Sequence, residues 1–78
     1  MKLKTLLKKV DENCFVSITF YAYGIYYANT CADGINTCKE VLNRIKPWLL
    51  DVMVTKLWLQ EVRREGPSFL CINCEICK

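Results

Sequence analysis

The hydrophobic pattern opens with a short amphipathic segment at the start of the chain. Its apolar residues recur at i, i+3, i+4 and i+7, with lysines between them: Leu3, Leu6, Leu7 and Val10. This spacing is typical of a helix that lays one apolar stripe on a core. The polar residues 11–13 break the pattern and mark the end of the predicted helix.

The next stretch, CFVSITFYAYGIYYANT, is rich in β-branched and aromatic residues, and Gly24 is its only glycine. It predicts two strands, at about residues 14–21 and 25–30, joined by a tight turn through residues 22–24. Side chains alternate between the two faces of a strand. One face of the first strand therefore carries Val16, Ile18 and Phe20, and the other carries Phe15, Ser17, Thr19 and Tyr21.

A second helix is predicted from Thr30 to the residues before Pro47. Thr30 followed three residues later by Asp33 resembles a capping box with Asp in place of Glu. The expected buried stripe of this helix is Ile35, Cys38, Leu42 and Ile45, and Pro47 ends it. Trp48 is then expected to close the end of the core.

After Trp48 the pattern returns to strands. The runs LDVMVTKLWLQEVRR and SFLCINCEICK are separated by the polar turn REGP, which favours a hairpin. Trp58 lies between Lys56 and Gln60, so it is expected on the sheet face away from the helices. The order α-β-β-α-β-β predicts an α+β fold in one domain, residues 1–78, with one four-stranded antiparallel sheet and two helices packed on one face.

The terminal segment CINCEICK allows two interpretations. As a metal site, Cys71, Cys74 and Cys77 would be zinc ligands, but the segment has neither the glycine nor the proline that a tight ligand turn uses. As a strand, its alternation puts Cys74 on one face and Cys71 and Cys77 on the other, where they could not share one ion with Cys74. We favour the strand, and we expect no metal and no cofactor.

Composition narrows the function classes. The chain has 78 residues, a net charge of +3 and no histidine, so it lacks the commonest general base and metal ligand. No phosphate loop or activated nucleophile is evident, so we expect no enzyme. Residues 14–30 contain no lysine or arginine between the aromatics, which argues against direct nucleic-acid binding.

The lysine-interrupted start and the lack of a long apolar run predict neither a secretion signal nor a membrane span. We therefore expect a cytoplasmic protein with mostly free thiols. Its apolar fraction is 53%, which is high for a soluble domain and indicates an interface with a partner or a second copy.

The segments LKTLLKKVDENCFVSI and YGIYYANTCADGI carry a resemblance. Over about residues 1–45 the chain resembles small accessory proteins encoded by phages and prophages of Gram-positive gut bacteria. In that group a leading helix ends at an acidic-Asn turn, a hairpin follows, and a small residue precedes an AD-x-[LI] helix start. The matching residues are Leu3, Leu6, Leu7, Asp11, Asn13, Val16, Ile18, Gly24, Ala32, Asp33 and Ile35.

These matching motifs are structural, so the resemblance transfers no functional residues. It implies an accessory phage gene that acts in the cytoplasm of the infected bacterial cell, often by countering host defence, as anti-CRISPR proteins do. The second half of the chain, with its two tryptophans and its terminal cysteines, departs from the usual pattern.

Two sets of residues are candidates for binding. The expected protein-binding or dimer face is Phe15, Tyr21, Tyr23, Trp58 and Phe69, because aromatic side chains give contact area at low entropic cost. Arg63 and Arg64 in the predicted turn are candidate anion contacts.

Three functions remain open. The first hypothesis is a non-enzymatic, anti-CRISPR-like inhibitor that binds a host defence protein stoichiometrically. The second is an oligomeric sponge for a nucleotide second messenger, with Arg63, Arg64 and tyrosines at a subunit interface. The third is a cysteine-metal module. They predict, respectively, a heteromeric complex, an oligomer with bound nucleotide, and stoichiometric zinc.

Overall fold

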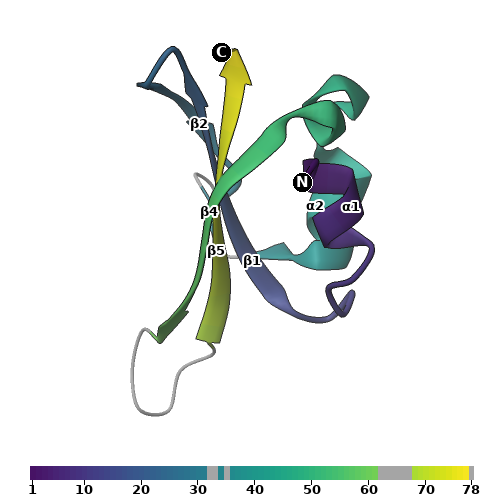
Figure 1. Cartoon of the computed structure of the whole chain (residues 1–78). Helices are drawn as coiled ribbons and strands as arrows, with labels where there is room; N and C mark the ends of the chain where they lie inside the picture. Colours follow the sequence, from purple (N-terminus) through teal and green to yellow (C-terminus); the bar gives the residue numbers. More distant parts are fainter. Residues whose placement is uncertain (32–33, 35, 62–67, 78) are drawn as a thin grey trace.

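Helices and strands follow one another in a pattern close to the predicted one (Figure 1). The computed structural model describes residues 1–31, 34, 36–61 and 68–77. Its elements are α1 (Leu3–Leu7), β1 (Phe15–Ala22), β2 (Ile25–Asn29), β3 (Asn36–Thr37), α2 (Cys38–Arg44), the 3₁₀ helix η1 (Pro47–Asp51), β4 (Met53–Glu61) and β5 (Ser68–Cys77). The chain is a small α+β domain, as expected.

The sheet differs from the prediction in its directions. The strand order is β2-β1-β5-β4, and the short β3 pairs with the start of β1 to make a fifth strand. Neighbouring strands β1 and β5 run parallel, whereas β1–β2 and β4–β5 are antiparallel. The expected four-stranded, fully antiparallel sheet is therefore wrong: the sheet is mixed and has five strands.

The connection through α2 and η1 explains the parallel pair. Strand β3 lies against the first residues of β1, and α2 starts there, with Cys38 N–H donating to the Cys14 carbonyl (2.7 Å). The helix carries the chain back toward the other end of β1, so β4 begins at Met53, opposite Glu75 of β5. Strand β4 then runs antiparallel to β1. Because β5 follows β4 as its antiparallel neighbour, β5 must run parallel to β1.

The core lies between the sheet and the two helices, which Figure 1 places on the same side of β1. Leu3, Leu6 and Leu7 of α1 are buried, as their spacing predicts. They pack with Val16, Ile18 and Phe20 of β1, Ile72 and Cys74 of β5, and Cys38 and Val41 of α2. The predicted faces of β1 and β5 are therefore the observed ones, with residues 70, 72, 74 and 76 of β5 directed toward the core.

Helix α2 begins later than its sequence pattern indicates. The capping box is formed by Thr37 and Glu40, not by Thr30. The Thr30 hydroxyl instead accepts from the Ile18 backbone N–H (3.0 Å), so it holds β1 and is not available as a cap. Asp33, its expected partner, lies outside the described residues.

The later start also changes the buried stripe of α2. Cys38 is buried and Ile45 is partly buried, as predicted, but Val41 occupies the core where Leu42 was expected. Leu42 is exposed, and Ile35 lies outside the described residues. Pro47 ends α2 indirectly, because it is the first residue of η1.

Removing the cap should weaken α2 measurably. Glu40 N–H donates to the Thr37 hydroxyl (3.3 Å), and Thr37 N–H donates to Glu40 Oε1 (3.0 Å). The substitution Thr37→Ala is expected to lower the free energy of unfolding by about 1 kcal/mol in urea denaturation. Thr5→Ala, an exposed threonine inside α1, is the matched control and should change it much less. Equal effects would contradict the assignment of this cap.

The β1–β2 hairpin closes where its glycine predicts. Ala22 pairs with Ile25, so Tyr23 and Gly24 form a two-residue turn. Both have positive φ, 54° and 77°, which is the backbone of a type I′ turn and matches the twist of the strands. Gly24 adopts this conformation without strain, whereas Tyr23 is exposed at the tip.

The terminal segment is a strand. Residues 68–77 pair with β1 on one side and β4 on the other, so the strand interpretation of CINCEICK is confirmed. Cys74 is fully buried in the core, and Cys71 lies on the opposite face beside its β4 neighbour Trp58. The side chain of Cys77 lies outside the described part of the chain.

Candidate functional site

A pocket of about 370 Å³ lies between the hairpin β1–β2 and the segment α2–η1. Its apolar walls come from four elements: Phe20 of β1, Ala28 of β2, Val41 of α2 and Leu49 of η1. Phe20, Val41 and Leu49 also belong to the core, so the pocket floor is the outer edge of the core. Packing of the surrounding elements thus forms the pocket without a ligand.

Two aromatic rings stand at the mouth of the pocket. Tyr27 of β2 and Trp48 of η1 meet edge to face, with ring centroids 6.4 Å apart and planes at 72°. Both side chains are about half exposed, at 53% and 47%. Trp48 therefore does not close the end of the core as expected. It forms an aromatic corner with Tyr27 that is open to solvent.

The cations of the pocket come from the end of α2. Arg44 is the last residue of the helix, and Lys46 precedes η1; both line the pocket, and among the described residues no acidic side chain lines it. Ile45 between them leaves the helix with extended backbone, ψ 140°. Among the described residues neither cation forms an ion pair. The hydrogen bonds from Thr37 lower the pKa of Glu40, and the charge of Arg44, one turn later, adds to this effect.

The polar residues of the lining are tied to the protein itself. Asn36 is buried and donates to the carbonyls of Thr30 (2.9 Å) and Gly34 (3.2 Å). The amide of Asn29 donates to the Thr19 hydroxyl (2.7 Å), and its oxygen accepts from Cys31 N–H. These bonds hold one wall rigid, and they leave the arginine, the lysine and the two aromatic residues to meet a ligand.

A second exposed feature is the outer edge of β4. At the start of this strand, the N-terminal residues pair with it: Val54 N–H donates to the Met1 carbonyl (2.9 Å), and Leu3 N–H donates to the Val52 carbonyl (2.9 Å). Lys2 and Met53 form an antiparallel bridge at this point. From Lys56 to Leu59 no described residue pairs with this edge.

The open part of β4 carries three consecutive apolar residues. Leu57, Trp58 and Leu59 are 48%, 37% and 65% exposed. A bulge between Val54 and Lys56 shifts the alternation, so Leu57 and Leu59 lie opposite Ile72 and Leu70 on the helix-bearing side of the sheet. The helices do not extend over them.

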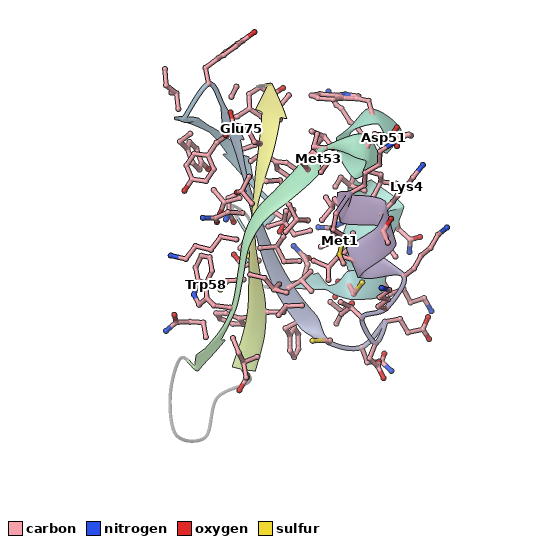
Figure 2. All side chains as sticks on the ribbon, in the orientation of Figure 1. Met1, Lys4, Asp51, Met53, Trp58 and Glu75 are labelled. Carbon is pink, nitrogen blue, oxygen red and sulfur yellow. The ribbon has the colours of Figure 1, made fainter. Side chains whose placement is uncertain are left out.

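The predicted aromatic face is only partly assembled. Trp58 points away from the helices, as expected (Figure 2). The Lys56 ammonium lies over its ring, 5.1 Å from the ring centroid. Phe15 and Phe69 are neighbours on β1 and β5 on that same face. Tyr21 lies at the far end of β1, beyond Ser17 and Thr19, and Tyr23 is in the hairpin turn. Polar residues thus separate Tyr21 from the other aromatic residues of the predicted face.

Three buried cysteines, Cys38, Cys71 and Cys74, are held as neutral thiols. Burial raises the pKa of Cys74 to about 12, and burial together with Cys14, Asp11 and Glu12 raises the pKa of Cys38. The pKa of Cys71 is raised by burial and by Cys31. The described residues include no cluster of three Cys, Asp or Glu side chains that could share a metal ion.

Arg63 and Arg64, the predicted anion contacts, lie outside the described residues. The cations that the structure brings to a pocket are instead Arg44 and Lys46. Sequence reasoning missed them because RIKPW has the composition of an ordinary helix end. The exposed run Leu57–Leu59 did carry a signal, since three adjacent apolar residues cannot all face one core.

Comparisons with known proteins do not assign the chain to a family. No protein-family model matches it, and neither a curated protein nor a solved structure is significantly similar. None of the helices in the described ranges combines the length and apolar character needed to cross a bilayer.

Proposed function

We propose that this chain is a non-enzymatic binding protein that holds a partner protein along the outer edge of β4. The observation that supports this is the open edge of residues 56–59 with its exposed Leu57, Trp58 and Leu59. An unpaired strand edge offers backbone donors and acceptors to another strand, and the apolar side chains beside it add contact area. Tryptophan is a residue that frequently dominates such interfaces.

The partner that we propose is a bacterial defence protein, bound by adding one of its own exposed strands to the sheet. The phage-accessory resemblance of residues 1–45 provides this context. The net charge of the chain is +3, so it lacks the strong negative charge that a DNA mimic carries. This favours a mechanism in which the chain blocks its target instead of imitating DNA. The expected readout is inhibition in proportion to the amount of protein, without turnover.

The test is to express the chain in bacteria that each carry one defence system, including CRISPR systems, and to measure plaque formation by a targeted phage. One system is expected to lose its protection. The purified defence complex should then bind the chain in native mass spectrometry at a fixed ratio. Protection retained in every strain would contradict the proposal.

The matched variants are Leu59→Lys, at the β4 edge, and Leu42→Lys, at an exposed position of α2. Leu59→Lys is expected to weaken the complex about tenfold or more, because it places a charge in an apolar contact. Leu42→Lys should have little effect. A homodimer that Leu59→Lys dissociates would instead assign the edge to a second copy and overturn the choice of partner.

A further inference from the structure

The pocket between β2 and α2–η1 has the features of a small-ligand site that is separate from the β4 edge. Its volume, about 370 Å³, lies at the lower end of the range of ligand pockets, roughly 300–1,000 Å³. Its interior is apolar and its polar side chains are few, which is the usual composition of such sites. A pocket of this size admits a small organic molecule.

The aromatic corner determines the shape of the ligand. Tyr27 and Trp48 present two ring faces that are nearly perpendicular, at 72°. A planar ring can stack on one of them while its edge meets the other, and stacking of a base on an aromatic side chain contributes about 1–3 kcal/mol. Both rings are half exposed without a ligand, so a bound ring would cover apolar surface that now contacts water.

The two cations determine the charge of the ligand. Arg44 and Lys46 flank one residue at the end of α2, and the described part of the pocket lining contains no carboxylate that would neutralise them. The last carbonyls of α2 carry partial negative charge, which the cations offset. An anion with several acceptor oxygens, above all a phosphate, suits a guanidinium and an ammonium that line the same pocket.

We propose that this pocket binds a nucleoside monophosphate, with the base at the corner of Tyr27 and Trp48 and the phosphate between Arg44 and Lys46. The site lies within one chain and needs no second subunit. It goes beyond the proposed protein-binding function and does not depend on it. The pocket uses none of the residues of the β4 edge.

Tryptophan fluorescence tests the site directly. In a Trp58→Phe background, Trp48 is the single tryptophan of the chain. Titration with the monophosphates of adenosine, guanosine, cytidine and uridine is expected to give a saturable change in Trp48 emission for at least one, with a Kd below about 1 mM. No saturable change with any of the four would overturn the proposal.

Charge variants test the anion contact. The double variant Arg44→Gln, Lys46→Gln is expected to weaken binding at least about tenfold, because it removes two charge-assisted contacts. The control, Lys9→Gln with Lys39→Gln, removes the same charge from exposed positions outside the pocket lining and should change Kd less than about twofold. Equal losses of affinity in the two double variants would mean that net charge alone causes the effect, and would overturn the proposed site.

Ligand controls test the two halves of the proposal. The nucleosides without phosphate should bind much more weakly than the monophosphates, and inorganic phosphate alone should leave Trp48 emission unchanged. A nucleoside that binds as tightly as its monophosphate would contradict the role of the cations. Phosphate alone producing the full change would contradict the role of the aromatic corner.

Discussion

Replacing Phe20 with alanine is expected to lower the free energy of unfolding by about 3–5 kcal/mol. Phe20 is 2% exposed and is the largest fully buried side chain of the described residues. Its removal deletes contacts with both the sheet and the helices and leaves a cavity that rigid strands cannot close. A domain of this length has a total stability of about 4–12 kcal/mol at 0.05–0.15 kcal/mol per residue. The variant should therefore be largely unfolded at room temperature or melt far earlier.

The matched control is Phe15→Ala, the same change on the same strand but on the opposite face. Phe15 is only partly buried, so its loss is expected to lower the free energy of unfolding by about 1 kcal/mol. Urea denaturation followed by circular dichroism measures both. A Phe15→Ala cost as large as that of Phe20→Ala would mean that the outer face is covered too, and it would contradict the one-sided core described above.

The protein is expected to lose stability between pH 9 and about pH 12 because of Cys74. The thiol has a pKa near 9.0 in the unfolded chain, and burial raises it to about 12 in the folded protein. The folded state keeps the proton more tightly, so the stabilisation by the neutral thiol is complete below pH 9. It is lost as the pH rises to the folded pKa. The shift corresponds to on the order of 4 kcal/mol.

The variant Cys74→Val separates this effect from other alkaline titrations. Valine fills a similar volume but has no proton to lose, so its free energy of unfolding should fall much less between pH 9 and pH 12. The pKa values of Cys38 and Cys71 are also raised by burial, and their contributions remain in both proteins. Urea denaturation at several pH values gives the two slopes. Parallel slopes for the parent and Cys74→Val would show that this thiol does not control the alkaline limit.

Features that depend on neighbouring residues could be predicted well. The stripe of α1, the two faces of β1, the turn at Gly24 and the strand at residues 68–77 all follow from side-chain alternation or helical spacing. Capping was predicted less well, because two threonines are each followed by an acidic residue three positions later. Only the structure shows that the Thr30 hydroxyl bonds to β1, which leaves the Thr37–Glu40 pair to start α2.

The residues of the candidate sites could not be grouped from the sequence, because only the fold brings them together. Arg44 and Lys46 are two positions apart in the sequence, but Tyr27 belongs to β2, and the strand β3 and the helix α2 follow it in the chain. No local spacing connects these residues. They share a pocket because β2 forms an edge of the sheet and η1 turns the chain back beside it. The open edge of β4 likewise depends on which strand is outermost.

The amino-acid pattern alone thus determined α1, the hairpin of β1 and β2, the strand at residues 68–77 and the buried faces of β1 and β5, because these follow from side-chain spacing within one element. The tertiary structure decided how the elements meet. The parallel pairing of β1 with β5 follows from the return of the chain through α2 and η1, and the bulge after Val54 turns Leu57 and Leu59 to a side that the helices leave uncovered. Strand direction and strand order depend on contacts between residues far apart in the chain, and spacing along the sequence carries no information about them.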